Sequence, residues 1–261
     1  MAISERVGFF TDSSICIGCK ACEVACKEWN NVPVNELAFL GSSYDNTGTL
    51  GANTWRHVSF AEQDGTDGLR WLMNSDVCKH CAEAGCLDVC PTGAIFRTEF
   101  GSVVVQAEVC NGCGYCIPAC PFGVIARRDG FEGRSDRGTA QKCTLCYDRL
   151  KGGLEPACAQ ACPTKSIQFG LLSELQPRAQ RRVAELRAQG HADARLYLAD
   201  ERDNAIGGAG AFFLLMDEPA AYRFPEQPLA ATRRLGGMWA SAAAAMAALA
   251  VGVAAAALGE R

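Results

Sequence analysis

Cysteine is the residue type in this chain that is best suited to chemistry. The 261-residue sequence contains 16 cysteines, and cysteine thiolates are ligands for iron and zinc. They fall into four groups of four with none left over, which indicates metal centres rather than isolated thiols. The groups are Cys16, Cys19, Cys22 and Cys26; Cys78, Cys81, Cys86 and Cys90; Cys110, Cys113, Cys116 and Cys120; and Cys143, Cys146, Cys158 and Cys162.

The third group shows most directly which metal centre is expected. It has the spacing C-x2-C-x2-C-x3-C-P, typical of bacterial iron–sulfur proteins, and the second group differs by two extra residues before its third cysteine. Three thiolates at such intervals reach three irons of one cubane, whereas the fourth begins the next helical turn and ligates another cluster. Pro91 and Pro121 then fix the exit of the chain, because proline lacks an N–H and restricts the residue before it.

Two other chemistries compete for these cysteines. A disulfide framework is typical of short secreted chains, and residues 1–14 contain no basic region followed by an apolar one, as a secretory signal would. Structural zinc would use two pairs of C-x2-C, but it does not explain four x3-C endings, three of which precede proline. We therefore predict four [4Fe–4S] clusters.

The charge of the chain fits this chemistry and excludes another. The net charge of −4 provides no basic surface for nucleic acid. Each cluster is negatively charged, and the basic residues near the cysteines are candidates to offset that charge, although ordinary solvated positions suit each of them equally well. These residues are Lys20, Lys79, Arg127, Lys142 and Lys165.

The second and third groups are joined by a segment of strand character. Residues 93–96 and 103–105 predict a β-hairpin, with Gly101 between them. Residues 69–73 before the two groups and 124–126 after them predict a second strand pair. This stretch therefore has the layout of a complete two-cluster ferredoxin, with an inner unit of about residues 69–128.

The first and fourth groups can repeat the same scheme. If residues 7–10 pair with residues 166–169, an outer unit of residues 1–30 and 138–170 encloses the inner unit as an insertion. The spacing also permits a sequential pairing of the first group with the second and the third with the fourth, but we favour the nested one. It predicts set 1 as Cys16, Cys19, Cys22 and Cys162; set 2 as Cys26, Cys143, Cys146 and Cys158; set 3 as Cys78, Cys81, Cys86 and Cys120; and set 4 as Cys90, Cys110, Cys113 and Cys116.

The segments between and after the groups carry weaker signals. Residues 30–75 are dense in Gly, Asn, Thr and Asp and predict a surface loop with strand-like pieces at 55–60 and 69–73. His57 is interpreted as a loop histidine. His80 is interpreted as a spacer, because the thiolates already complete each ligand set.

After residue 170 the composition changes. Residues 171–235 predict a C-terminal extension that covers one face of the cluster unit or docks a partner. Within it, residues 174–189 predict a surface helix that ends at Gly190, and residues 211–216 predict a strand.

The last feature is an uncharged, Ala-rich run at residues 238–258, from which we predict a transmembrane helix over 236–259. As a helix the run is roughly 31 Å long, enough for a bilayer core. An Ala-rich soluble helix is the alternative, and the lack of a polar face argues against it. Arg233 and Arg234 precede the run and only Arg261 follows it, which by the positive-inside tendency favours a cytoplasmic body.

Four stretches resemble the four-cluster ferredoxin-like electron-transfer subunits of molybdopterin oxidoreductases. They are CIGCKACEVACKEWN at 16–30, GCGYCIPACPF at 112–122, KCTLCYDR at 142–149 and EPACAQACPT at 155–164. The tail, with RVAELRAQG at 182–190 and a single hydrophobic helix, is similar to that of the β (iron–sulfur) subunit of membrane-bound formate dehydrogenase.

The resemblance implies an α+β fold of two nested ferredoxin-like two-cluster units, a C-terminal extension and one transmembrane helix. It implies four [4Fe–4S] clusters in the nested sets, a catalytic α subunit with a molybdenum or tungsten pterin, and a membrane cytochrome b γ subunit that reduces quinone. In that family the iron–sulfur subunit has no leader of its own, crosses the membrane with a partner that bears a twin-arginine signal, and faces the outer, periplasmic-type side, which we slightly favour here. Nitrate reductase relatives replace one cysteine with Trp, whereas all sixteen positions here are Cys.

We therefore expect a non-catalytic electron-transfer subunit that carries electrons from formate oxidation to a membrane cytochrome b. The sequence shows no nucleophile–base pair, phosphate loop or pterin site. The main alternative is the equivalent subunit of another membrane oxidoreductase, such as a hydrogenase or a polysulfide, tetrathionate or sulfoxide reductase. A stand-alone soluble polyferredoxin is a further alternative.

Overall fold

A four-stranded sheet forms the largest regular part of the computed structural model, which describes residues 5–34, 39, 41, 44–65, 68–130, 133–200 and 205–259. Its strands lie in the order β8-β1-β10-β9. They are β1 (Val7–Asp12), β8 (Ile167–Leu171), β9 (Arg195–Tyr197) and β10 (Ala211–Leu215). Both central strands, β1 and β10, are apolar and almost wholly buried, as expected where a sheet is covered on both faces.

The predicted pairing of the first and last cysteine-flanking strands is confirmed. β1 and β8 are antiparallel, with Phe9 opposite Phe169. The predicted strand at 211–216 also exists, but it lies parallel to β1 on the other side from β8. The region that we assigned to a C-terminal extension therefore supplies two strands to the sheet that begins with β1.

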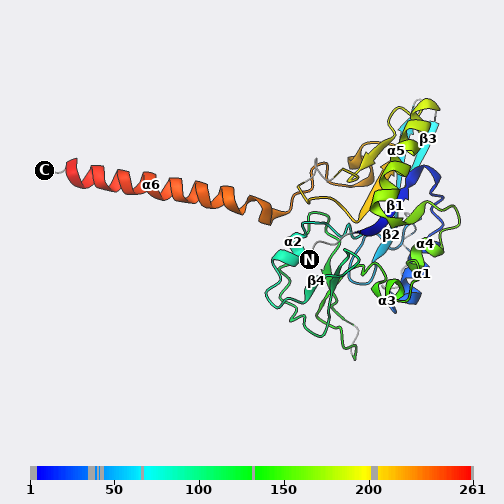
Figure 1. Ribbon diagram of the computed structural model, residues 1–261, viewed down its shortest axis with the longest axis horizontal. Helices are drawn as coiled ribbons and strands as arrows, with labels where there is room; N and C mark the ends of the chain where they lie inside the picture. Colours follow the sequence, from blue (N-terminus) through cyan, green and yellow to red (C-terminus); the bar gives the residue numbers. More distant parts are fainter. Residues whose placement is uncertain are drawn as a thin grey trace.

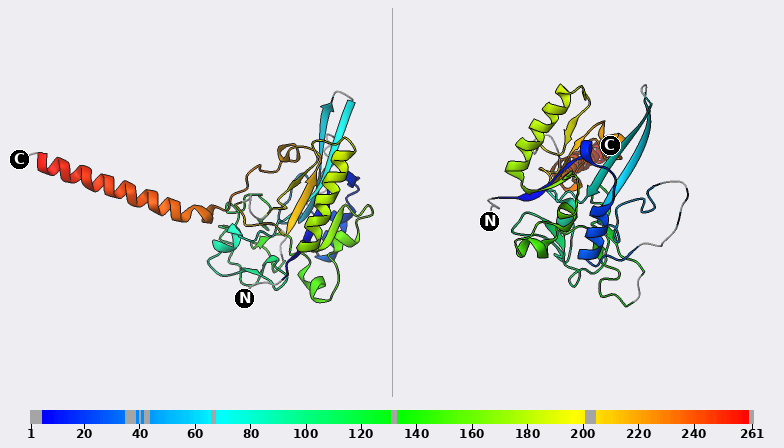
Figure 2. Two further views of the ribbon diagram at one scale, coloured as in Figure 1. Left: turned by 45° about the horizontal axis from the view of Figure 1, so that its top comes forward. Right: turned by 90° about the vertical axis from the view of Figure 1, so that its right-hand side faces the viewer.

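Helix α5 (Leu172–Ala188) covers this sheet (Figure 2). The predicted surface helix is confirmed, and one of its faces is buried at intervals of three and four residues, as an amphipathic helix requires. The buried residues are Leu172, Leu175, Ala179, Val183 and Leu186. They share a core with Phe10 and Phe212, whose rings stack with centroids 5.3 Å apart.

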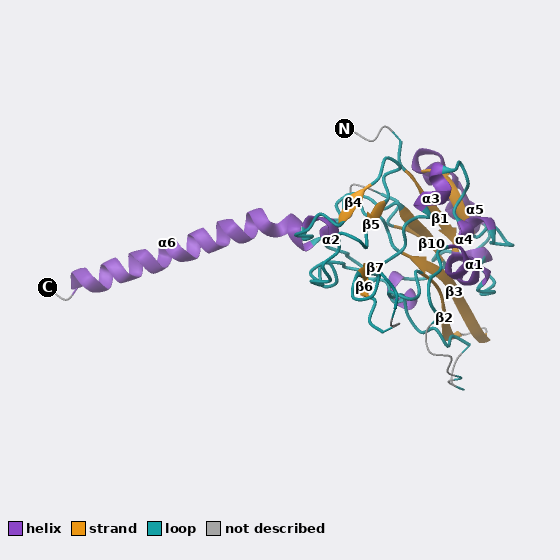
Figure 3. Cartoon of the chain, turned by 90° about the horizontal axis from the view of Figure 1, so that it is seen from below, coloured by secondary structure: helices purple, strands orange, loops and turns teal. Residues whose placement is uncertain are grey.

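The strand-like pieces predicted at 55–60 and 69–73 are confirmed, but they belong to two long paired strands rather than to a surface loop. Strands β2 (Arg56–Gly65) and β3 (Gly68–Val77) pair along their full length and project from the body (Figure 3). The prediction that 69–73 pairs with 124–126 is wrong. Because β2 and β3 are neighbours in the chain, their pairing closes a much shorter loop. Strand β6 (Ala126–Arg127) instead pairs with β7 (Ala140–Gln141).

The cysteine motifs lie on short elements. The predicted hairpin between the second and third groups is confirmed as β4 (Ile95–Arg97) and β5 (Val103–Val105). The helix that carries Cys22 and Cys26 begins at Ala21. The helices are α1 (Ala21–Trp29), α2 (Gly85–Asp88), α3 (Tyr147–Lys151) and α4 (Ala157–Gln160), with 3-10 turns at Ser13–Ile15, Pro219–Tyr222 and Ala231–Arg234.

The chain ends in the long helix α6 (Leu235–Gly259), which extends away from the body (Figure 1). Residues Leu235–Ala256 are long and apolar enough to cross a membrane, and none of their most apolar window is buried in the protein. The root of this helix lies beside α2, where the Thr232 hydroxyl donates to Asp88 at 2.7 Å and Arg233 pairs with Glu83.

Candidate iron–sulfur centres

Two packed helices present four of the cysteines. Cys22 and Cys26 lie one turn apart on α1, and this helix packs against α4, which carries Cys158 and is followed by Cys162. All four are buried. Because residues four apart share a helix face, Cys22 and Cys26 lie on the same face of α1, whereas α4 contributes Cys158 and Cys162 lies just beyond its end.

The four cysteines of set 1 line one small pocket. Val58 and Ile167 supply apolar walls, and the Ser75 hydroxyl lies 3.2 Å from the Cys22 sulfur. Burial raises the pKa of the Cys22 thiol to about 12, against the effect of the neighbouring guanidinium of Arg56. The cavity is therefore a site where a thiolate needs positive charge beside it.

The four cysteines of set 3 line a second small pocket. Its walls include Val103, Phe122 and Ile125, together with the buried side chain of Lys142. Burial raises the pKa of the Cys86 thiol to about 12, while Lys142 acts in the opposite direction.

Set 2 is the most deeply enclosed of the four, since all its cysteines are buried. Burial raises the pKa of the Cys26 thiol well above its usual value, and the neighbouring sulfurs of Cys143, Cys158 and Cys146 raise it further. Cys146 adopts a left-handed backbone conformation (φ 49°) at the start of α3.

The cysteines of set 4 are more exposed to solvent than those of set 2. Burial raises the pKa of the Cys116 thiol to about 11, and the sulfurs of Cys110, Cys113 and Cys90 add to the effect. Cys113 is exposed, and Cys110 accepts a hydrogen bond from the backbone N–H of Ala140 at 3.4 Å. The sulfurs of Cys90, Cys110 and Cys113 are therefore close enough to Cys116 to affect its pKa.

The thiols also connect the sets in a series, because cysteines of neighbouring sets raise one another's pKa in addition to the dominant effect of burial. The three connections are Cys22 of set 1 with Cys158 of set 2, Cys143 of set 2 with Cys78 of set 3, and Cys86 of set 3 with Cys116 of set 4. The only two exposed cysteines of the sixteen, Cys19 and Cys113, belong to sets 1 and 4. The two exposed cysteines thus fall in the two sets at the ends of this order.

The donor set fits iron–sulfur clusters better than the two competing chemistries. All sixteen cysteines are free, which contradicts a disulfide framework. Within the described ranges, no three Cys, His, Asp or Glu side chains converge closely enough to hold a single metal ion such as zinc, whereas a cubane is wider than one ion. Arg56 is buried, and its Nε and Nη2 atoms have no hydrogen-bond partner, so this guanidinium fits beside an anionic cluster.

The five candidate basic residues have different positions. Lys142 lies among cysteine sulfurs, as predicted. Lys20, Lys79 and Arg127 are each paired with a carboxylate, and Lys165 is exposed. Arg56, which lies beside Cys22 and Cys158, was missed, because nothing near it in the sequence shows that β2 folds against the first motif.

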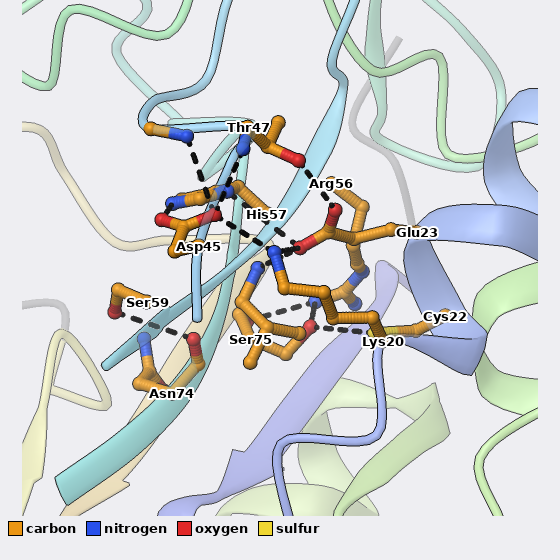
Figure 4. A network of polar contacts seen from close by, with 12 residues as sticks. Lys20, Cys22, Glu23, Asp45, Thr47, Arg56, His57, Ser59, Asn74 and Ser75 are labelled. Carbon is orange, nitrogen blue, oxygen red and sulfur yellow. Dashed lines mark hydrogen bonds and ion pairs between the residues drawn. The ribbon is translucent and has the colours of Figure 1, made fainter. Parts of the chain in front are cut away.

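His80 and His57 are not cluster ligands in this arrangement. The Nδ1 atom of His80 accepts a hydrogen bond from the backbone N–H of Val103 at 3.1 Å, in keeping with its interpretation as a spacer. His57 is not a loop residue. It is buried in β2, and its Nε2 atom lies 2.9 Å from a carboxylate oxygen of Asp45 (Figure 4).

The network around His57 ties the first motif to the hairpin. Glu23, next to Cys22 on α1, accepts a hydrogen bond from the backbone N–H of Val58. Lys20 bridges Glu23 and Asp45, at 3.3 and 2.8 Å (Figure 4). These contacts hold the first cysteine loop against β2.

Comparison with known protein families identifies the class. A family model described as "4Fe-4S dicluster domain" matches residues 69–172, and a second model with the same description matches residues 15–94. The chain is therefore built from 4Fe–4S dicluster domains, and its sixteen cysteines fit four [4Fe–4S] clusters.

Individual relatives are more specific. The chain is 41% identical over 227 residues, 85% of its length, to the nitrate-inducible formate dehydrogenase iron–sulfur subunit of Escherichia coli (strain K12), of which it covers 74%. It is 42% identical to the formate dehydrogenase iron–sulfur subunit of Haemophilus influenzae, with 83% of this chain and 68% of the relative covered. It is 36% identical to the B subunit of E. coli anaerobic dimethyl sulfoxide reductase, with 67% and 78% covered. The chain belongs to the family of formate dehydrogenase iron–sulfur subunits, and it is an electron-transfer subunit rather than a catalytic one.

Proposed function

We propose that this chain carries electrons from a molybdopterin-containing, formate-oxidising catalytic subunit to a membrane cytochrome b that reduces quinone. The observation that carries the proposal is the order of the four cysteine sets, whose two exposed cysteines, Cys19 and Cys113, belong to the two end sets. Such a series is suited to electron entry at one surface and exit at another. When bound, each [4Fe–4S] cluster supplies a one-electron carrier.

The ligand sets in this proposal are the nested ones. The pairing of β1 with β8 supports them, because it brings together the strands that flank the first and fourth motifs. The two cavities support them further, since one is lined by all of set 1 and the other by all of set 3. The nested outer and inner units, and the division at about residue 170, are part of the same proposal.

The direction of the series follows from the position of α6. Its root contacts α2, which carries Cys86 of set 3 and is followed by Cys90 of set 4, whereas α1 and α4 lie across the domain (Figures 1 and 3). Set 4 therefore lies toward the membrane. Set 1, with the exposed Cys19, faces the catalytic subunit.

The protein side chains determine how well such a series conducts. Apolar walls such as Val58 and Ile125 exclude water from the cavities, and the hydrogen bond between Ser75 and Cys22 is of the kind that tunes a cluster potential. The cysteines are held on short helices and tight turns, so the distances between neighbouring sets are fixed by the fold.

Helix α6 is the membrane segment in this proposal. It is exposed on its described surface and has no charged residue after Arg234, apart from those at its C-terminal end. Its Ala-rich surface suits close packing against helices of a membrane partner. We place the body on the outer, periplasmic-type face. The arginines before the helix argue for the cytoplasmic face by only one or two charges, which transport of a folded complex overrides.

The test is replacement of Cys116 by Ser in the assembled complex. The cluster of set 4, at the membrane end, is then lost, so formate-to-quinone electron transfer falls to background. Formate oxidation by the catalytic subunit, measured with a soluble dye as electron acceptor, remains. Cluster content is measured as iron and acid-labile sulfide. Unimpaired quinone reduction with one cluster missing would overturn the proposal.

The 36% identity to the B subunit of dimethyl sulfoxide reductase favours one alternative, the equivalent subunit of a membrane reductase with electrons flowing toward the catalytic subunit. The large subunit that co-purifies with this chain distinguishes the two. A formate-oxidising partner supports the proposal, whereas a partner that reduces a sulfoxide supports the alternative.

A further inference from the structure

Two buried cations without a carboxylate partner lie at the junctions between neighbouring cysteine sets. Among the described residues the side chains of Arg56 and Lys142 are almost fully buried, at 1% and 2% exposure, and neither forms an ion pair with Asp or Glu. A buried charge without a counter-charge is strongly unfavourable. Their positions therefore require another source of negative charge.

Arg56 lies at the junction of sets 1 and 2. Its Nη1 atom donates to the Ser75 carbonyl at 2.9 Å and lies 3.2 Å from the Ser75 hydroxyl, which in turn lies 3.2 Å from the Cys22 sulfur (Figure 4). Its guanidinium carbon sits 4.7 Å from the centre of the Phe9 ring.

The remaining nitrogens of Arg56, Nε and Nη2, are buried and have no hydrogen-bond partner. Burial acts against the charge, but the sulfurs of Cys158, Cys22 and Cys143 raise the pKa of Arg56 above its usual value. Two of these sulfurs belong to set 2 and one to set 1, so the guanidinium faces both sets.

Lys142 occupies the equivalent place between sets 2 and 3. Its Nζ atom donates to the carbonyl oxygens of Val103 and, at 3.2 Å, Cys143. It lines the cavity of set 3 and directly precedes Cys143 of set 2. Burial acts against this charge too, yet the cysteine sulfurs of both sets raise the pKa of Lys142.

Other buried cations of the described chain are satisfied in the ordinary way. Lys79 pairs with Asp76, and Arg128 pairs with Asp136. For Arg128 no cysteine affects the pKa.

Among the described residues Arg149 is also buried without a carboxylate partner, but it donates to the carbonyl oxygen of Glu155 and to the side-chain oxygen of Gln160. Arg56 and Lys142 differ from it in that each lies among cysteine sulfurs of two neighbouring sets.

We propose that Arg56 and Lys142 are positioning charges that raise the reduction potentials of the clusters on both sides of them. Both cations then raise the potential of the cluster of set 2, and neither raises the potential of the cluster of set 4. The proposal rests on the proposed function and its ligand sets. Reduction adds one negative charge to a cluster, and a fixed positive charge nearby stabilises that reduced form more than the oxidised one. Each cation therefore favours electron occupancy of the two sites that it separates.

The experiment is an anaerobic redox titration of the full-length protein in detergent, followed by electron paramagnetic resonance. Arg56→Gln should lower the potentials of the clusters of sets 1 and 2. Lys142→Gln should lower those of sets 2 and 3, so the cluster of set 2 responds to both substitutions. For each affected cluster we expect the reduced-to-oxidised ratio at a fixed potential to fall at least about tenfold, which is 59 mV for a one-electron couple. In the double variant the shared cluster should shift by the sum of both effects, and one cluster should not move.

Charge-retaining and matched variants separate this role from a structural one. Arg56→Lys and Lys142→Arg should keep the potentials near those of the unaltered protein. Arg128→Gln removes a cation of similar burial that faces no cysteine, and it should leave all four potentials unchanged. If a glutamine variant assembles fewer clusters, Arg56→Met or Lys142→Met replaces it, because an apolar chain of similar length avoids burying an amide.

The possible failures are distinguishable. Unchanged potentials in protein that contains four clusters, or an equal shift of all four, would overturn the proposal while leaving the proposed function intact. Loss of a cluster in both the glutamine and the methionine variant would assign the residue a structural role and would also overturn it. An unaltered protein without four clusters would instead contradict the ligand sets and the proposed function.

Discussion

The outer and inner halves of the body hold their cysteines in different ways. The outer half has a large apolar core rich in Phe and Leu between α5 and the sheet β8-β1-β10-β9, while buried residues of α1 and α4 belong to a neighbouring cluster. The inner half, residues 78–128, has a small core in which most of the neighbours are cysteines, with Ile95, Val103 and Ile125 among the few larger apolar side chains.

This difference in core size predicts which half depends on its cofactor for folding. Conformational entropy must be offset in both halves, and a small core offsets less of it. In the inner half the chain is organised by short hairpins and turns that converge on thiols, so the binding energy of the clusters supplies a large share of its stability. The outer half has a core that stabilises the sheet without the clusters.

Removal of iron should therefore have the largest effect of any change, and it should separate the two halves. In protein stripped by an anaerobic chelator, amide protection in β5 should fall by at least about a hundredfold, equivalent to about 2.7 kcal/mol, while protection in β10 falls much less. Hydrogen exchange with mass spectrometry measures both. Equal loss in the two strands would contradict the comparison, and reconstitution with iron and sulfide provides the control.

Phe212→Ala attacks the outer half directly. Phe212 is fully buried and stacks on Phe10, so the substitution leaves a cavity in the main core and should cost about 3–5 kcal/mol. The opening free energy of β1 and β10 amides by hydrogen exchange is the measurement. Phe96→Ala is the matched control, because Phe96 is 36% exposed on β4 and should cost less than about 1 kcal/mol. Equal costs at the two positions would show that the outer core is not the main source of stability.

Asp136→Asn tests whether a buried cation away from the clusters needs its own carboxylate. It leaves the side chain of Arg128, 2% exposed, without a counter-charge and should destabilise the β6–β7 pair by about 2–3 kcal/mol. Local hydrogen exchange of β6 and β7 measures this. A destabilisation of less than a third of that value would show that the buried Arg128 side chain does not need the charge of Asp136.

The same aspartate makes a prediction for pH. The hydrogen bond from Arg134 holds the pKa of Asp136 below its usual value, with further help from Arg128 against the effect of burial. A lowered pKa means that the stabilisation is fully present above the pKa of an unfolded aspartate, about 3.9, and is lost as the pH falls through the folded value. The stability of the Asn variant should lack this acid-side decrease.

How much of this the sequence predicts depends on how local the cause is. The cysteine spacing predicts the gathering of thiols because the motif itself curls round a cluster, and the apolar runs of β1, β4, β5 and β8 predict strands because they flank the motifs. The long hairpin at residues 56–77 was underestimated because its polar composition resembles a loop, although each strand pairs with its immediate neighbour in the chain.

Non-local contacts account for what could not be predicted. The strand β10 lies parallel to β1 in the middle of the sheet, about two hundred residues away along the chain, and no local pattern specifies that choice. Arg56 escaped notice for the same reason, because its relation to Cys22 exists only once β2 packs on α1. Lys142, adjacent to a cysteine in the sequence, was a candidate from the start.

Arg127→Gln should have the smallest effect, and it sharpens the contrast with Arg128 next to it. The Arg127 side chain is 48% exposed and its partner Asp129 is 70% exposed, so solvent screens the pair and its loss should cost less than about 0.5 kcal/mol. Although Arg127 lies near the inner motifs in sequence, it should also leave all four cluster potentials unchanged. Redox titration and hydrogen exchange on one preparation check both expectations. A shift in any potential would mean that exposed charges tune these clusters as well, and burial at a junction would then no longer explain the special position of Arg56 and Lys142.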